Sequence, residues 1–115
     1  MHRLVRAFPL LPGKREAFDA FVAEVTYRKQ EMSSFYRTYG IVRESWHLQT
    51  TPGGDMVICC TDLNDLPAAA HEYAESQAPF ETWFKGKVRE LCGVDPNRQP
   101  EGPPAKSLFD WPGLA

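Results

Sequence analysis

The sequence predicts an α+β domain in which an antiparallel sheet carries helices on one face. Two β-type runs flank residues 52–55, whose Pro-Gly-Gly-Asp sequence is typical of a tight turn. Long helical patterns lie on both sides of this hairpin, and another β-type run opens the chain. The order strand, helix, hairpin, helix therefore favours a single mixed domain.

The composition agrees with one domain and argues against several classes of function. The chain has 115 residues and a formal net charge of −2, with 13 basic residues scattered among 15 acidic ones. A chain of this length buries about two-thirds of its unfolded surface in one core. It offers no basic field for nucleic acid, no membrane-spanning apolar run and no signal peptide pattern. We expect a soluble, cytoplasmic protein with a domain at 1–95 and a tail at 96–115.

The cysteines do not form a recognisable disulfide or metal pattern. Their number is odd, and the adjacent pair Cys59 and Cys60 would point to opposite faces of a strand, with Cys92 far away. Zinc sites space their thiolates two to four residues apart and need further ligands. We therefore expect reduced, buried thiols and no metal.

The first third of the chain predicts a strand followed by a long helix. Residues 3–10 suit a short strand, with Pro9 at its end or at a sheet edge. Apolar side chains then recur at helical spacing up to Gly40, which can adopt a left-handed cap. We expect a bend or break at Ser33–Ser34. The apolar positions are Phe18, Phe21, Val22, Val25, Met32, Phe35, Tyr36 and Tyr39.

The hairpin strands predict a sheet that is covered on both faces. The second strand, 42–50, alternates so that Trp46 and His47 point to opposite faces, and we place Trp46 inward. The third strand, 56–61, is apolar on both faces, which is typical of a central strand. Helices would cover one face, and we expect a partner subunit on the other.

Two helical segments and a tail complete the chain. A helix is expected from about residue 67 to 76, and a second one follows Ala78–Pro79 and ends before Gly93. The Pro-rich composition beyond residue 95 predicts an extended tail. Because Ser107–Trp111 is apolar, we expect this end to dock as an edge strand or on a neighbouring subunit. The alternative is a disordered tail.

This order of elements resembles the ferredoxin-like dimeric α/β-barrel superfamily. The resemblance rests on LVRAFPLLPGKREAFDAFVAEV, GIVRESWHLQTTPGGDMVICCTD and AESQAPFETWFKGKVRELCGVD, which cover most of the chain. The strings ESWHLQTTPGGD and PFETWFKGKV are most similar to small bacterial proteins of unknown function. The superfamily implies a homodimer, and its members include cofactor-free monooxygenases, haem-degrading enzymes and small isomerases. The fold alone therefore supports several chemistries.

Haem degradation within that superfamily implies a helix histidine ligand with an asparagine and a tryptophan in the pocket. The nearest equivalents are His71 with Trp46 or Trp83. The asparagines Asn64 and Asn97 fall in expected turns or tail, so the set is incomplete. We expect no cofactor.

Two charges on otherwise apolar strand faces are the first candidates for a binding site. Arg6 alternates with Leu4 and Phe8, and Glu44 alternates with Trp46 and Leu48. If neighbouring strands carry them, they would form an ion pair that orients a carboxylate or enolate. The alternative is a purely structural pair inside the barrel or at the dimer seam.

Histidines and aromatic side chains are the remaining candidates. His47 and His71 could move a proton if they faced a cavity; the alternatives are an interface or surface position for His47 and an exposed helix position for His71. Trp83 could stack on a planar ligand or simply pack in the core. Tyr36 and Tyr39 could offer hydroxyl groups near the end of the first helix.

Two hypotheses follow for function. The first is a non-catalytic dimer that binds a small apolar or planar acidic molecule. The second is a cofactor-independent monooxygenase or isomerase in which Arg6 and Glu44 orient the substrate and a histidine moves a proton. Neither involves nucleic acid or a membrane.

Overall fold

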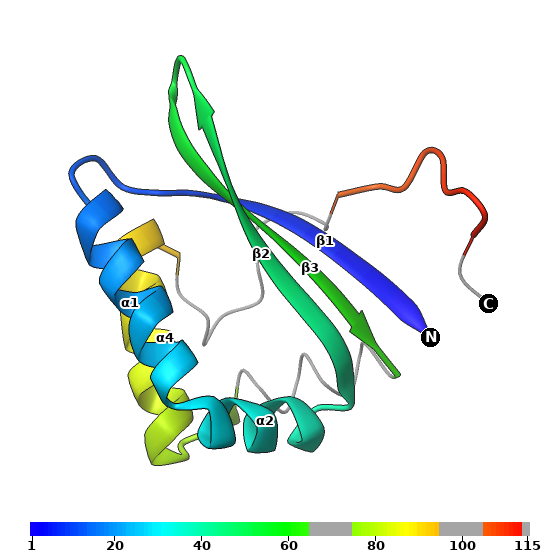
Figure 1. Ribbon diagram of the computed structural model, residues 1–115, viewed down its shortest axis with the longest axis horizontal. Helices are drawn as coiled ribbons and strands as arrows, with labels where there is room; N and C mark the ends of the chain where they lie inside the picture. The colour runs from blue at the N-terminus through cyan, green and yellow to red at the C-terminus, as the bar shows by residue number, and fades with distance from the viewer. Residues whose placement is uncertain (65–74, 95–104, 114–115) are drawn as a thin grey trace.

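In the computed structural model, a three-stranded antiparallel sheet carries helices on one face (Figure 1). The structure describes residues 1–64, 75–94 and 105–113. This arrangement confirms the predicted α+β class. The described elements are β1 (His2–Pro9), α1 (Arg15–Tyr27), α2 (Lys29–Thr38), β2 (Ile41–Thr51), β3 (Gly54–Leu63) and α4 (Pro79–Cys92).

The central strand of the described sheet is β3, with β1 and β2 on either side. Cys59 of β3 pairs with Arg6 of β1 and with Trp46 of β2, so these three side chains share a face. Trp46 packs against α1, which makes this the helix-covered face. By the same register His47 points to the outer face, as the alternation predicted.

The long helix predicted from the sequence is two helices that meet at Arg28. Its backbone leaves the helical region there, with φ −87° and ψ 41°, whereas Ser33 and Ser34 lie inside α2. The predicted break at Ser33–Ser34 is therefore wrong. The second helix ends at Thr38, and Gly40 takes a left-handed φ of 68°, close to the predicted stop.

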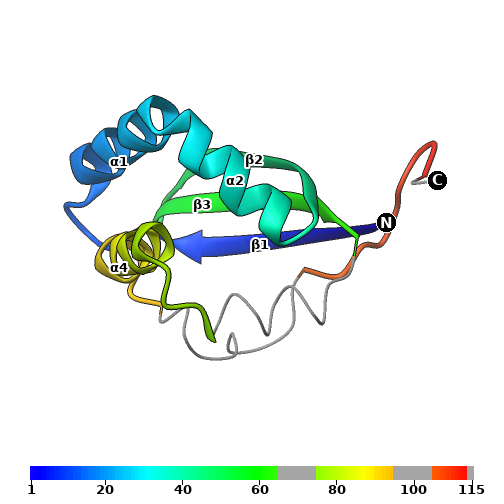
Figure 2. The ribbon, with the colours of Figure 1, turned by 90° about the horizontal axis from the view of Figure 1, so that it is seen from below.

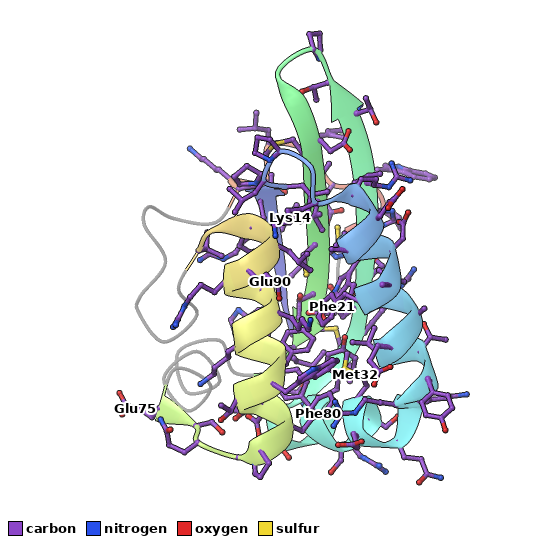
Figure 3. All side chains as sticks on the ribbon, turned by 90° about the vertical axis from the view of Figure 1, so that its left-hand side faces the viewer. Lys14, Phe21, Met32, Glu75, Phe80 and Glu90 are labelled. Carbon is purple, nitrogen blue, oxygen red and sulfur yellow. The ribbon has the colours of Figure 1, made fainter. Side chains whose placement is uncertain are left out.

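The core between the sheet and the helices is largely aromatic. Phe21 of α1 stacks on Trp46, with ring centroids 5.7 Å apart and an interplanar angle of 11°. It also touches Trp83 and Phe84 of α4, at 5.6 and 5.4 Å. In Figure 3 the labelled Phe21 lies between α1 and α4. Large rings at this density leave little room for a ligand behind Trp46.

The last described helix, α4, begins and ends at the residues that the sequence predicted. Pro79 occupies its first turn, and Gly93 caps it with a left-handed φ of 73°. The helix expected near residues 67–76 falls mostly outside the described residues. None of the described helices is both long and apolar enough to cross a membrane.

The C-terminal segment 105–113 leaves the sheet beside β1 (Figure 2). Ala105 N donates to Val5 O at 2.8 Å, which ties the start of the segment to the outer edge of β1. Beyond this bond the described segment forms no strand, so the edge strand is not seen there. Its large apolar side chains are almost fully exposed, namely Leu108 at 87%, Phe109 at 86% and Trp111 at 82%.

Candidate functional site

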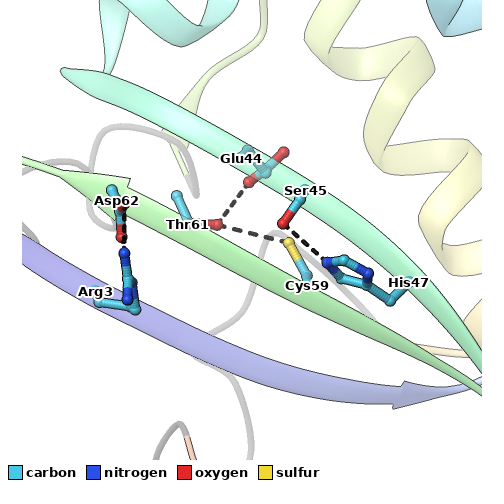
Figure 4. A network of polar contacts seen from close by, with 7 residues as sticks. All are labelled: Arg3, Glu44, Ser45, His47, Cys59, Thr61 and Asp62. Carbon is cyan, nitrogen blue, oxygen red and sulfur yellow. Dashed lines mark hydrogen bonds and ion pairs between the residues drawn. The ribbon is translucent and has the colours of Figure 1, made fainter. Parts of the chain in front are cut away.

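Glu44 is the centre of a polar cluster on the helix-covered face. Its Oε2 accepts hydrogen bonds from Tyr36 Oη at 2.6 Å and Trp46 Nε1 at 3.0 Å. Its Oε1 accepts one from Thr61 Oγ1 at 2.7 Å (Figure 4). The donors come from α2, β2 and β3, so one carboxylate joins a helix to two strands. Such charge-assisted bonds fix both the carboxylate and the indole of Trp46.

Arg6 is not the partner of Glu44, although both lie on the predicted face. Arg6 belongs to β1 and Glu44 to β2, and β3 lies between them. Two strand spacings set their backbones about 9–10 Å apart, and none of the ion pairs between described residues joins Arg6 to Glu44. The predicted Arg6–Glu44 pair is therefore wrong, because it assumed neighbouring strands. The Glu44 carboxylate instead accepts hydrogen bonds from the neutral side chains of Tyr36, Trp46 and Thr61.

Cys59 lies beside this cluster as a protonated thiol. Its Sγ is 3.6 Å from Thr61 Oγ1. Burial, together with the nearby Glu44 carboxylate, raises the pKa of Cys59 to about 12. Burial also raises the pKa of Cys92, and all three cysteines are free. A thiol that stays protonated near neutral pH is not an activated nucleophile.

A groove of about 270 Å³ runs between α1 and the edge strand β2. Asp19 of α1 and His47 of β2 are the polar residues of its lining, but the imidazole of His47 lies on the outer face of the sheet, away from α1. His47 is exposed, and its Nε2 lies 3.0 Å from Ser45 Oγ. The apolar lining is formed by Phe18, Val22, Trp46 and Leu48. An apolar lining with an acid beside it suits a small ligand that has an apolar face and polar edges.

The outer face of the sheet carries a second, smaller hollow of about 210 Å³. Arg3 donates to both oxygens of Asp62, at 2.8 and 3.1 Å (Figure 4). This bidentate bond lowers the pKa of Asp62, and Arg43 adds to the effect. The remaining lining residues are Ser45 and Cys60. Because Asp62 already neutralises one arginine, this hollow is a weaker candidate for an anion site.

Trp83 is not an open stacking platform. The guanidinium carbon of Arg28 lies 4.3 Å from the centre of a Trp83 ring and 4.8 Å from that of Phe80. Glu31 holds the same guanidinium with two bonds of 2.9 Å. Hydrogen bonding from Arg28 lowers the pKa of Glu31. This cation–π contact occupies a ring face that a planar ligand would need.

The sequence candidates thus divide into three groups. Trp46 and His47 line the groove, Glu44 supports Trp46, and Arg6 lies half-buried on the helix-covered face away from both hollows. His71 lies outside the described residues. The sequence analysis did not single out Asp19, because in the sequence it is indistinguishable from the other polar residues on the exposed side of this amphipathic helix. Within 1–64, 75–94 and 105–113, no group of three or more His, Cys, Asp or Glu residues could hold a metal ion.

The described elements form an α+β domain in which a three-stranded antiparallel sheet carries helices on one face. A solved structure with this fold is the L-rhamnose mutarotase from Formosa agariphila, with a TM-score of 0.66 and 12% sequence identity. The similarity covers 96% of this chain and 98% of the mutarotase. At this identity the likeness shows the shared fold alone. No protein-family model and no curated protein matches the sequence.

Proposed function

We propose that this protein binds a small molecule with an apolar face and hydroxyl groups at its edge in the groove between α1 and β2. The observation that carries the proposal is the lining of that groove, in which Asp19 and His47 accompany an apolar wall that includes Trp46. An indole accepts the apolar face of a ring, and the Asp19 side chain selects hydroxyl groups at its rim. The volume of about 270 Å³ suits a single small ring.

The groove changes the ligand class expected from the sequence. A planar acid was expected because Arg6 and Glu44 appeared to form an anion-binding pair. Arg6 does not line the groove, whereas the carboxylate of Asp19 does. Asp19 Oδ1 accepts a hydrogen bond from Arg15 Nε at 3.2 Å, and the carboxylate keeps further acceptor positions for hydroxyl groups, whereas no lysine or arginine lines the groove to hold an acid. A neutral polyhydroxylated ring is therefore favoured over a planar acid.

Ligand-observed saturation-transfer NMR tests this proposal. The probes are L-rhamnose, D-glucose and a planar acid such as salicylate. Saturation should reach the sugars in the wild-type protein and vanish with Val22→Arg, which puts a charged side chain on the groove wall. Tyr27→Arg is the matched control, because Tyr27 lies on the same helix at 87% exposure and does not line the groove. Sugar signals that survive Val22→Arg, or salicylate as the stronger ligand, would contradict the proposal.

A second candidate is an isomerase that moves a proton between the anomeric hydroxyl and the ring oxygen of a sugar. Asp19 lines the groove and can accept the proton of the anomeric hydroxyl and return it to the ring oxygen. The fold neighbour carries the name of a sugar mutarotase, which makes L-rhamnose the first substrate to test. Exchange NMR between the two anomers should show acceleration that Asp19→Asn removes and that His47→Gln, on the outer face, leaves unchanged. Binding without any acceleration would leave the non-catalytic module as the function.

A homodimer through the outer sheet face belongs to the same proposal. That face presents Val5, Ile58 and Cys60 as half-buried side chains, and no helix among the described residues covers it. A half-apolar sheet face requires cover in water. Native mass spectrometry of the purified protein reports both the assembly and any retained ligand. A ligand-free monomer would count against both parts.

A further inference from the structure

The outer face of the sheet brings a hydroxyl group and an imidazole into contact. Ser45 and His47 are two residues apart on β2, so both side chains point to this face, away from the helices. His47 Nε2 lies 3.0 Å from Ser45 Oγ, and a dashed line joins the two side chains in Figure 4. With the ring proton on Nδ1, Nε2 accepts the hydrogen bond that the hydroxyl donates. The same contact joins a serine nucleophile to its general base.

Burial does not require this contact, and its position gives it a use. His47 is exposed and Ser45 is half-buried, so water can satisfy both groups. Ser45 also lines the outer-face hollow of about 210 Å³. A hydroxyl group that contacts an imidazole and lines a hollow has the placement that attack on a bound substrate requires.

The charges of the hollow suit a reaction in which one negative charge develops. Two arginines, Arg3 and Arg43, and one acid, Asp62, belong to its lining, which therefore carries one net positive charge. Arg3 holds Asp62 by two hydrogen bonds, whereas Arg43 acts on the same carboxylate through its charge. A guanidinium beside a reacting carbonyl group stabilises the oxyanion of a tetrahedral intermediate. Arg43 is the arginine two residues before Ser45 on the same face of β2, which makes it the candidate for this role.

We propose that Ser45 and His47 form a nucleophile–base pair that hydrolyses small, uncharged carboxylic esters in the outer-face hollow. Ser45 Oγ attacks the carbonyl carbon of the ester while its proton passes to His47 Nε2, and Arg43 stabilises the oxyanion. The intermediate then breaks its bond to the alcohol, which leaves with the proton from His47. Water next attacks the acyl-serine and gives a proton to His47, which returns it to Ser45 Oγ as the acid leaves. Ester and water thus become acid and alcohol.

The surroundings of the pair define the substrate class. Val5 and Ile58 lie on the same face as half-buried apolar side chains, which suits a short apolar acyl group. Asp62 belongs to the lining and opposes a negatively charged substrate, and it also favours release of the acid product. A small, uncharged ester matches both features.

This activity goes beyond the groove proposal and does not depend on it. The groove lies between α1 and β2, whereas the Ser45 hydroxyl and the His47 imidazole lie on the other face of the sheet. Both residues belong to β2, which is an edge strand of the described sheet. A substrate can therefore reach them from the side of the sheet.

Labelling of the full-length wild-type protein with diisopropyl fluorophosphate tests the inference directly. An activated serine displaces fluoride from phosphorus, so Ser45 Oγ should gain a diisopropylphosphoryl group, which tandem mass spectrometry assigns to a single residue. His47→Gln should lower the labelling rate at least about tenfold, because the general base is lost. His2→Gln is the matched control, since His2 is exposed at the start of β1 and lines neither hollow.

Hydrolysis of p-nitrophenyl acetate measures the activity itself. Ser45→Ala should lower the rate above the spontaneous one at least about tenfold, and Ser34→Ala, which removes an exposed serine of α2, should leave it unchanged. Arg43→Met should lower kcat with little change in KM, because it removes a contact made in the transition state.

The wild-type label decides the matter even where a variant fails to fold. A label on Ser45 that depends on His47 and not on His2, together with the loss of hydrolysis in Ser45→Ala, is the expected result. The absence of a label, a label on another serine, or equal hydrolysis by Ser45→Ala and wild type would each overturn the inference. Sugar binding in the groove is measured separately and is unaffected by any of these results.

Discussion

Removing the acceptor from the Glu44 cluster should destabilise the protein far more than removing its charge. In Glu44→Leu, the hydroxyl of Thr61 loses its partner at a site that is only 6% exposed, which costs about 1–3 kcal/mol. Tyr36 and Trp46 are half-buried and can turn toward water, so each loses about 0.5–1 kcal/mol. A half-buried leucine recovers about 1 kcal/mol, so we expect a net loss of about 1–4 kcal/mol.

The amide variant separates charge from geometry. In Glu44→Gln, the amide oxygen still accepts from Tyr36 and Trp46, and the amide N–H₂ can donate to the Thr61 hydroxyl after that hydroxyl rotates. Only charge assistance is lost, which is worth about 1 kcal/mol. Thr61→Val is the matched control, since it deletes one donor without adding a charge or changing the shape of the strand.

Urea denaturation followed by circular dichroism and by tryptophan fluorescence measures these losses. The free energy of unfolding should fall in the order wild type, Glu44→Gln, Glu44→Leu, with an unchanged slope on denaturant. The fluorescence of Trp46 should shift in Glu44→Leu because its Nε1 bond is gone. Equal stability of Glu44→Leu and wild type would show that the cluster contributes nothing. Equal losses for Gln and Leu would refute the argument from hydrogen-bond donors.

Three further outcomes are expected. The Arg3–Asp62 bond lowers the pKa of Asp62. The bond therefore stabilises the fold fully above the pKa that Asp62 has in the unfolded chain, and this stabilisation is lost as the pH falls through the pKa of folded Asp62. The melting temperatures of wild type and Asp62→Asn should differ near pH 7 and converge below about pH 3, and a pH-independent difference would contradict this. Because the pKa of Cys59 is about 12, its Cβ chemical shift should not titrate between about pH 6 and 10 in ¹³C-cysteine NMR, and a transition near pH 8.5 would show that the thiol is not buried as described. Gly93→Ala should destabilise the protein by about 1–2 kcal/mol in urea denaturation, because Gly93 has a left-handed φ. Gly86→Ala should stabilise it by about 0.5–1 kcal/mol, because Gly86 lies within α4 and no atom would contact the added Cβ. Effects of the same sign for both variants would contradict this.

Much of the fold could be predicted because its signals are local. The turn at 52–55 and the alternation around Trp46 and His47 define a hairpin and its two faces without reference to any other segment. Gly40 and Gly93 stop helices through their own left-handed backbone conformation. Such features depend on a few consecutive residues, so sequence reasoning reaches them.

The errors concern contacts between distant segments. The break at Arg28 coincides with a guanidinium held over Phe80 and Trp83, about 50 positions away, and no local pattern indicates that contact. The sequence instead favoured a break at Ser33–Ser34, which lie inside α2. The Arg6–Glu44 pair likewise required the strand order, and the order β1-β3-β2 separates them. Alternation along a strand determines which face of the sheet a side chain occupies, whereas the order of the strands determines which side chains are neighbours.

The filled interior explains why the candidate site lies at the edge of the sheet. A ligand behind Trp46 would have to displace Phe21, which stacks on the indole and also packs against α4. Opening that space would cost about 3–5 kcal/mol, the typical loss for removing a phenylalanine side chain from a core. The groove beside β2 presents the same tryptophan without that cost, since Val22 and Leu48 already leave a hollow there. The Glu44 cluster then serves binding indirectly, by holding the indole of Trp46 at the wall of the groove.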